Sequence, residues 1–206
     1  MDILLQLMAS SSLAAFAGLR AWFPLLVLGL LARDGYAHIN PDFQALTTTP
    51  VLIGLGVLTI LEFLGDKVIA VDHFLDAVGT LLRPLSGAVL ASATLTGLDP
   101  TTSVIIGSLL GGSTAFTVHT GKAVTRAKAS LLAPLHLGTG NVALSFTEDI
   151  ISAGGAWLVF HHPVFAFILA VFLVLLALLL IVFAIRTGTK IFHFLTGRRV
   201  PPAATS

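Results

Sequence analysis

The stretch from Glu62 to Arg83 reads EFLGDKVIAVDHFLDAVGTLLR, and it decides what kind of protein this is. It places several charged side chains between long apolar runs, in a chain of 206 residues that is only 10% charged. These are Glu62, Asp66, Lys67, Asp72, Asp76 and Arg83. A charged side chain inside hydrocarbon costs roughly 2.5–3.5 kcal/mol on insertion scales. Such a residue persists only where it faces the protein interior, finds a partner or serves a function.

The composition predicts an integral membrane protein. Hydrophobic residues make up 56% of the chain, and the mean hydropathy is +0.99. A soluble domain has about a quarter of its residues charged, because it needs a solvated surface. We therefore expect a multi-pass integral membrane protein, with the lipid bilayer as its main partner. The net charge of +1 argues against nucleic acid as a partner. The absence of cysteine excludes disulfides and thiolate chemistry, and we expect no cofactor.

Apolar segments separated by turn signals predict an all-α fold with about six transmembrane helices. The segments span about 3–32, 50–65, 73–96, 102–121, 141–160 and 163–185. Arg20 and Pro24 interrupt the first of them. Each segment supplies roughly the 20 residues that a membrane crossing needs. We expect a single helical domain over residues 1–195, followed by a polar cytoplasmic tail at 196–206.

The distribution of Lys and Arg predicts the orientation, because basic residues gather in cytoplasmic loops. With six spans, the N-terminus, the 66–72 loop, the 122–140 loop and the C-terminus share one side. That side holds Lys67, Lys122, Arg126, Lys128, Arg186, Lys190, Arg198 and Arg199, whereas the other side holds only Arg33. Both termini are therefore predicted to be cytoplasmic.

A weak internal similarity favours an inverted repeat. The sequence around 15–21 is echoed around 115–123, and Glu62 has a counterpart in Glu148 and Asp149. Halves of about 1–98 and 99–195 with three spans each have opposite orientations, because three is odd. This 3+3 plan is typical of secondary transporters, whose sites lie near the midplane at the repeat interface.

Polar residues recur at helical spacing in four of the segments. The recurring positions include Glu62 and Asp66, then Asp72, Asp76 and Arg83, then His119, Lys122 and Arg126, then Ser145, Glu148 and Ser152. Small and polar residues at such spacing also serve simply to hold membrane helices together. The segment 163–185 has no polar stripe, so we expect it to be peripheral and to face lipid.

The charged residues predict a polar site inside the membrane. Left unpaired, Arg20 and Arg83 would together cost about 5–7 kcal/mol, so carboxylates must meet them. The predicted substrate- or ion-binding residues are Arg20, Glu62, Asp66, Asp72, Asp76, Arg83, His119, Lys122, Glu148 and Asp149. A purely structural lattice of ion pairs is the alternative. We predict no metal site, because Asp72 and His73 project about 100° apart on a helix.

The motifs resemble one bacterial membrane family, which is catalogued as domain of unknown function 4126. The resemblance rests on Gly18-Leu19-Arg20-Ala21 with Pro24, Glu62–Lys67, Val71–Val78, Arg83-Pro84, His119–Ala123 with Arg126, and Glu148-Asp149. It covers about residues 10–185 and implies a multi-spanning topology in the bacterial inner membrane, without an activity. The stretch Glu62–Lys67 is also similar to the Glu-x-Gly-Asp-Lys signature of a cation/proton exchanger family, with one residue inserted.

These observations favour a small secondary transporter, coupled to ions or protons, whose substrate is a small ion or an anionic metabolite or lipid. We expect a homodimer, because six short helices make a thin wall around a path. In this hypothesis the carboxylates bind cations or protons, while the basic residues balance them or hold an anion. The alternatives are a membrane-embedded enzyme acting on lipid, with Asp72, Asp76 and His119 as acid or base groups, and a non-catalytic scaffold or accessory subunit.

Overall fold

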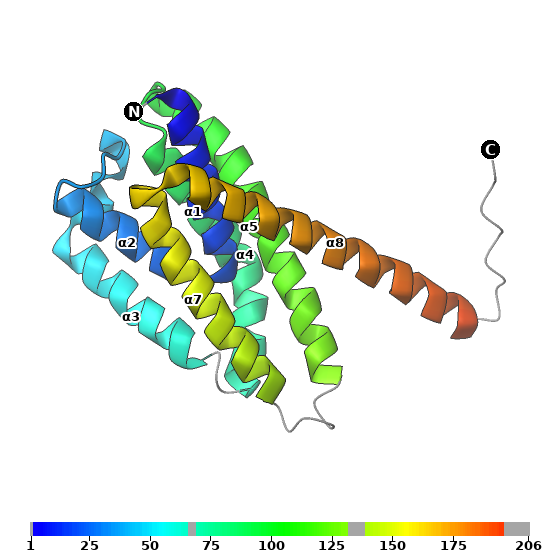
Figure 1. Ribbon diagram of the computed structural model, residues 1–206. Coiled ribbons are helices and arrows are strands. Elements are labelled where there is room, and N and C mark those ends of the chain that lie inside the picture. Colours follow the sequence, from blue (N-terminus) through cyan, green and yellow to red (C-terminus); the bar gives the residue numbers. More distant parts are fainter. Residues whose placement is uncertain (1, 66–68, 132–138, 196–206) are drawn as a thin grey trace, which may run out of the picture.

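The computed structural model describes residues 2–65, 69–131 and 139–195, with side chains over 2–65, 74–126 and 143–189. These residues form an all-α bundle (Figure 1). Its elements are α1 (Ile3–Leu19), α2 (Trp22–Arg33), the 3-10 helix η1 (Pro41–Thr47), α3 (Thr49–Gly65), α4 (Ile69–Thr94), α5 (Pro100–Leu131), α7 (Thr139–His161) and α8 (Pro163–Leu195). The predicted all-α fold class is thus confirmed.

The first predicted segment is a helical hairpin, not one continuous helix. α1 ends at Leu19, Arg20 is extended, and α2 begins at Trp22. The side chain of Gln6, near the start of α1, accepts a hydrogen bond from the backbone N–H of Gly97. The loop after α2 reaches the same end of the bundle, since the Asn40 N–H donates to the Ala93 carbonyl. The chain therefore enters and leaves by one end and reverses at Arg20 (Figure 1).

The lengths of the two arms explain why the hairpin stops inside the bundle. At 1.5 Å per residue, the 17 residues of α1 span about 26 Å and the 12 of α2 about 18 Å. Both are shorter than the roughly 30 Å hydrocarbon core. The start of α1 consequently lies opposite the end at which α3 finishes and α4 begins. This differs from the predicted arrangement, in which the N-terminus shares a side with the 66–72 loop.

α1 forms the centre of the bundle and contacts α4, α5, α7 and α8. Small residues allow these helices to approach closely. A Cβ atom added to Gly111 on α5 would lie 2.2 Å from the Gly87 carbonyl oxygen on α4. A Cβ atom added to Gly18 would lie 2.6 Å from the Ala115 carbonyl oxygen on α5. The apolar core forms around Leu13, Phe16 and these contacts.

Helix α5 has a well-defined start. Asp99 precedes Pro100, and the Asp99 carboxylate accepts a hydrogen bond from the Thr102 N–H at 3.1 Å. Hydrogen bonds from the side chain and backbone of Thr102 lower the pKa of Asp99 below its usual value. This is the usual role of an acidic residue preceding the first turn of a helix.

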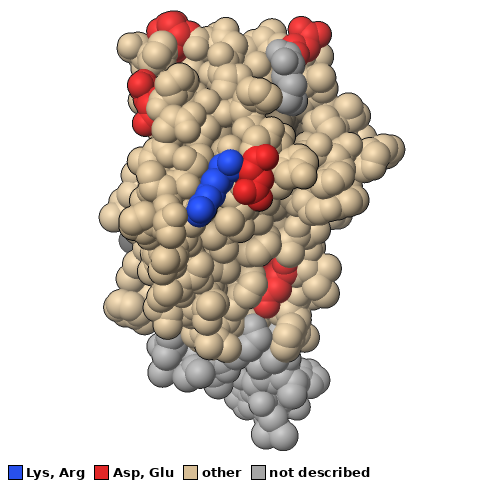
Figure 2. Space-filling model, turned by 90° about the vertical axis from the view of Figure 1, so that its left-hand side faces the viewer, with Lys and Arg blue, Asp and Glu red and all other residues tan. Residues whose placement is uncertain are grey.

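Three of the described helical stretches are long and apolar enough to cross a membrane, namely Phe74–Thr94, Pro100–Arg126 and Pro163–Thr189. The bent pair formed by η1 and α3 makes a fourth if it counts as one span. Few charged side chains reach the face shown in Figure 2, as expected for a surface in contact with lipid. These findings indicate a multi-pass membrane protein. The predictions of six spans, an inverted repeat and cytoplasmic termini stay predictions.

Helix α8 lies at the periphery, as its all-apolar sequence predicts. Only 17% of its most apolar stretch of 18 residues is buried, and large side chains such as Leu179 and Phe183 are exposed. Figure 1 shows α8 crossing the bundle obliquely and extending beyond it.

Candidate functional site

Eight ionisable side chains from five parts of the chain meet near the end of the bundle at which α3 finishes and α4 begins. We call them the charge cluster. Its members are Arg20 between α1 and α2, Glu62 on α3, Asp76 and Arg83 on α4, Lys122 and Arg126 on α5, and Glu148 and Asp149 on α7. Ion pairs link all eight into one network.

The helix break at Arg20 is stabilised by Glu62 on α3 and by Pro24 in the first turn of α2. The Glu62 carboxylate accepts hydrogen bonds from the backbone N–H groups of Ala21 and Trp22, at 3.1 and 3.3 Å. Ala21 has no capping side chain of its own, so Glu62 on α3 serves as the cap of α2. A carboxylate at a helix N-terminus is favourable, because the free N–H groups carry partial positive charge. Pro24 lies in the first turn of α2, where a missing N–H costs nothing.

Glu148 lies among three basic side chains. Its Oε2 atom is 2.8 Å from Arg126 Nη2, 3.0 Å from Lys122 Nζ and 3.9 Å from Arg20 Nη2. Its Oε1 atom accepts a second hydrogen bond from Arg126 Nε at 3.3 Å. Arg126 thus holds the carboxylate with two hydrogen bonds, the strongest arrangement that an arginine makes with an acid.

Asp76 lies among three basic side chains as well, two of which it shares with Glu148. Its Oδ1 atom is 3.1 Å from Arg83 Nη1 and 3.8 Å from Lys122 Nζ. Its Oδ2 atom is 3.9 Å from Arg126 Nη1. Lys122 and Arg126 therefore lie between the two carboxylates and bridge α4 to α7.

Arg83 and His119 connect the network to α3 and α5. Arg83 Nη2 lies 3.5 Å from Glu62 Oε1. The His119 Nδ1 atom contacts the Arg83 guanidinium, and the His119 Nε2 atom is 3.2 Å from the Thr80 hydroxyl. Both ring nitrogens are thus engaged by neighbours within the bundle.

Arg20 binds groups on two other helices. Its Nη2 atom is 2.6 Å from Asp149 Oδ1 and donates to the Ser145 hydroxyl at 3.0 Å. Its Nη1 atom donates to the Glu62 carbonyl oxygen at 3.4 Å. The guanidinium also lies 5.2 Å from the centre of the Phe63 ring, within the range of a cation–π contact.

The cluster has equal numbers of acidic and basic side chains, and the acidic ones are the more exposed. It holds four acidic and four basic side chains. The basic side chains are at most 4% exposed, whereas those of Asp76 and Asp149 are both 17% exposed. Burying this many charges is tolerable only because each has partners, since removing one partner of a buried pair typically costs about 3–5 kcal/mol. The carboxylates are therefore the more exposed members of the network.

A groove of about 150 Å³ leads to the cluster between α5, α7 and α8. We call it the lateral groove. Its walls are apolar, with Leu144 and Ile151 on α7 and Leu173 and Leu176 on α8. Among the residues that the structure describes, Lys122 and Glu148 are the only charged ones that line it. α5 and α8 both carry membrane-length apolar stretches. The lateral groove thus joins the lipid-facing surface to two members of the charge cluster.

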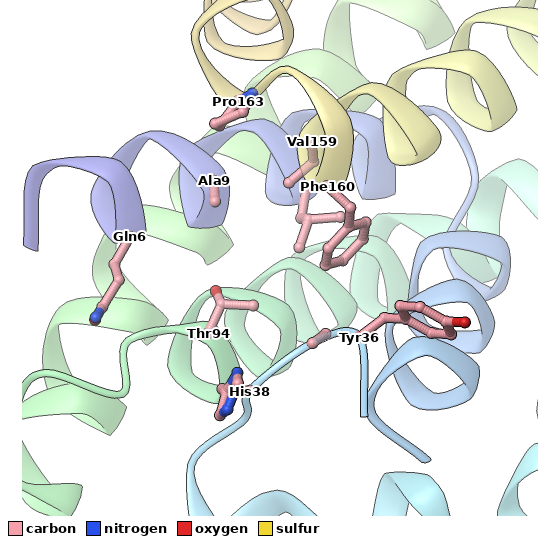
Figure 3. A pocket seen from close by; sticks show the side chains of 10 residues that line it. Gln6, Ala9, Tyr36, His38, Thr94, Val159, Phe160 and Pro163 are labelled. Atoms are coloured by element: carbon pink, nitrogen blue, oxygen red, sulfur yellow. The ribbon is translucent and has the colours of Figure 1, made fainter. Parts of the chain in front are cut away.

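A separate cavity of about 130 Å³ lies at the other end of the bundle (Figure 3). Gln6, Thr94 and Phe160 line it, together with Tyr36 and His38 from the loop after α2, and none of the described residues that line it is an acid, lysine or arginine. Thr94 is eleven residues beyond Arg83 on α4, about 16 Å along the helix. This cavity is therefore distinct from the charge cluster.

The structure brings together most of the predicted site residues. Arg20, Glu62, Asp76, Arg83, Lys122, Glu148 and Asp149 belong to the charge cluster, and His119 contacts it. Asp66 and the side chain of Asp72 lie outside the described residues. Arg126 was not among the predicted site residues, yet it makes the shortest contact to Glu148. Its spacing of four from Lys122, on the same helical stripe, was the signal that could have found it.

The comparison with protein families decides the assignment. The model of the family described as "Domain of unknown function (DUF4126)" matches residues 7–183. The chain belongs to this family. The match covers every helix that contributes to the charge cluster. A search of curated proteins and a search of solved structures each gave no match. The DUF4126 assignment therefore confirms the family resemblance in the sequence and brings no activity with it.

Proposed function

We propose that this DUF4126 protein is a small secondary transporter of the bacterial inner membrane, coupled to ions or protons, with the charge cluster as its site. The observation that carries the proposal is the convergence of eight ionisable side chains, from five parts of the chain, between apolar helices. Ionisable residues within membrane-spanning segments are costly and mark pathways of ions and substrates.

Two further observations support transport. The site forms where the α1–α2 hairpin breaks, and broken helices that meet ionisable groups inside the membrane are typical of transporter sites. The carboxylates are also more exposed than the basic groups that they neutralise. A proton or cation arriving from solvent reaches the carboxylates first and frees the basic groups for an anion. The inverted repeat and the homodimer are part of this proposal.

The proposal is tested by flux measurements on the reconstituted protein. Proteoliposomes with an imposed pH gradient are given a panel of organic and inorganic anions and cations, and internal pH is followed with a trapped dye. We expect the wild-type protein to move protons with at least one solute. Glu148→Gln should lower the proton flux at least tenfold, because it removes one of the two carboxylates that meet three basic groups. Asp42→Asn, which also replaces a carboxylate with an amide but at an exposed position, should leave the flux unchanged.

A non-catalytic scaffold is the second candidate, and the complete pairing of the carboxylates favours it. In that case the charge cluster only fixes the packing of α4, α5 and α7. A folded wild-type protein that moves no solute across the whole panel, together with a Glu148→Gln variant that merely unfolds more easily, would support the scaffold and refute transport.

A further inference from the structure

The position of Glu148 carries an inference about the substrate, which rests on the proposed function. We propose that the charge cluster accepts a single-chain anionic amphiphile. Its oxyanion headgroup takes the place of the Glu148 carboxylate among Arg20, Lys122 and Arg126, its chain lies in the lateral groove, and one proton enters with it. The argument has three steps, which concern the headgroup, the chain and the charge.

The three basic groups around Glu148 keep other partners when that carboxylate leaves. Arg20 remains bound to Asp149 at 2.6 Å and to Ser145 at 3.0 Å. Lys122 Nζ remains bound to the Leu19 carbonyl oxygen at 3.2 Å. Arg126 Nη1 lies 3.9 Å from Asp76 Oδ2. The cradle is thus fixed independently of Glu148, and an oxyanion at the Oε2 position would meet the same three cations.

The lateral groove indicates what the oxyanion is attached to. Of the two carboxylates that meet three basic groups, only Glu148 lines this groove, whereas Asp76 does not. The walls are built from leucine, isoleucine and other apolar side chains, and two of the helices that line the groove, α5 and α8, carry apolar stretches long enough to cross a membrane. An ion without an apolar part gains nothing from such walls, whereas an acyl chain buries its methylene groups there.

The balance of charge explains why one proton should enter together with the anion. With four acidic and four basic side chains, the cluster is neutral, and a monoanion entering it would leave one negative charge uncompensated. Protonation of the displaced Glu148 restores neutrality. Among the described side chains, the charged or titratable groups near Glu148 are Arg20, Lys122 and Arg126 directly, Asp149 beside it, and Asp76, Glu62, Arg83 and His119 through the shared network. α8, which also packs against α7, contributes only the exposed Arg186 from its described side chains.

The experiment measures binding in nanodiscs of zwitterionic lipid, so that it is independent of flux. The probe is dodecanesulfonate, whose headgroup stays ionised over the whole pH range, so that any proton taken up comes to the protein. Methanesulfonate supplies the same headgroup without a chain, and dodecyltrimethylammonium supplies the same chain with a positive charge. We expect only dodecanesulfonate to bind, with an affinity that falls about tenfold for each unit rise in pH while Glu148 is ionised.

Variants separate the three parts of the proposal. Glu148→Gln should bind dodecanesulfonate independently of pH, because its carboxylate no longer competes for the cradle. Thr147→Trp, at the rim of the lateral groove, should weaken binding at least tenfold, and so should Leu176→Trp from the α8 side. Thr117→Trp is the matched control, because Thr117 makes the same bond within its helix as Thr147 but does not line the groove.

Each contrary result overturns a defined part of the proposal. Equal binding of methanesulfonate refutes the role of the groove, and equal binding of dodecyltrimethylammonium refutes the anion site. Wild-type binding that does not change with pH refutes the coupled proton. Proton-coupled flux of some other solute without dodecanesulfonate binding would refute this inference and leave the proposed function standing, whereas binding without any flux would do the reverse.

Discussion

Arg20 is the residue on which the site and the fold depend together. Its side chain is fully buried, and its guanidinium binds Asp149, Ser145 and the Glu62 carbonyl oxygen. Its backbone is extended and separates α1 from α2. One residue thus both turns the hairpin and ties its tip to α3 and α7.

We expect Arg20→Met to lower the free energy of unfolding by about 3–5 kcal/mol, because it leaves Asp149 without its closest cation. Adding Asp149→Asn should recover part of that loss by removing the uncompensated charge. Arg33→Met, at an exposed position, should change stability by less than about 0.5 kcal/mol. Unfolding in mixed micelles checks all three. If the double variant were no more stable than Arg20→Met, the ion pair would not be the source of the effect.

Most residues of the charge cluster could be predicted from the sequence. An unpaired charge in hydrocarbon costs free energy, so charged residues in an apolar chain must find partners. The sequence did not predict which acid meets which base. Arg20 pairs with Asp149, and Arg83 with Glu62 and Asp76, only because the folded helices bring these positions within reach. Arg126 lies beyond residue 121, where the sequence predicts the apolar run to end, whereas α5 continues to Leu131 and carries Arg126 on the same helix as Lys122.

At the scale of helices, close approach between glycines sets the packing of α4 against α5. Gly87 and Gly111 face each other, and a methyl group on either would lie within 2.6 Å of the other's carbonyl oxygen. Because Asp76 and Arg83 lie on α4 while Lys122 and Arg126 lie on α5, this crossing also determines the spacing of charges in the cluster.

We expect Gly111→Ala to destabilise the protein by about 1–3 kcal/mol, because the added methyl group meets backbone that cannot move aside. Gly154→Ala is the matched control. It adds the same methyl group inside α7, where nothing lies within 4 Å, and should stabilise the helix by up to about 1 kcal/mol. Thermal unfolding of both variants provides the measurement. A loss of stability in Gly154→Ala equal to that in Gly111→Ala would contradict the packing argument.

The apolar segments in the sequence located the helices well, but not the reversal within the first of them. Periodicity and hydropathy are the same for a kinked span and for a hairpin. The difference depends on where Arg20 finds partners, and those lie on α3 and α7, far along the chain. Arg20 and Pro24 indicate a break in the sequence without indicating its direction.

For the whole molecule, the α1–α2 hairpin predicts the side of the membrane on which the N-terminus lies. The start of α1 contacts the turn between α4 and α5, so the two should face the same side of the membrane. The chain contains no cysteine, which makes single-cysteine variants straightforward. We expect Asp2→Cys and Tyr36→Cys to lie on the same side of the membrane. An impermeant maleimide should therefore label both variants under the same condition, either in intact cells or only after permeabilisation.

The counting of basic residues in the sequence predicts the opposite outcome, with these two positions on different sides. Labelling of Tyr36→Cys in intact cells, combined with labelling of Asp2→Cys only after permeabilisation, would contradict the hairpin and restore a spanning first segment. Thr96→Cys serves as a third position, in the turn that the N-terminal residues contact, and should label together with Tyr36→Cys.

The length of α8 ties the lateral groove to the thickness of the bilayer. Its apolar stretch of 27 residues is about 40 Å long, whereas the hydrocarbon core is about 30 Å thick. The mismatch is relieved when the helix tilts by about 40°. Leu173 and Leu176, which form one wall of the groove, move with that tilt. We therefore expect a thicker, more ordered membrane to hold α8 more upright and to change the width of the lateral groove, so that lipid composition should affect access to Lys122 and Glu148.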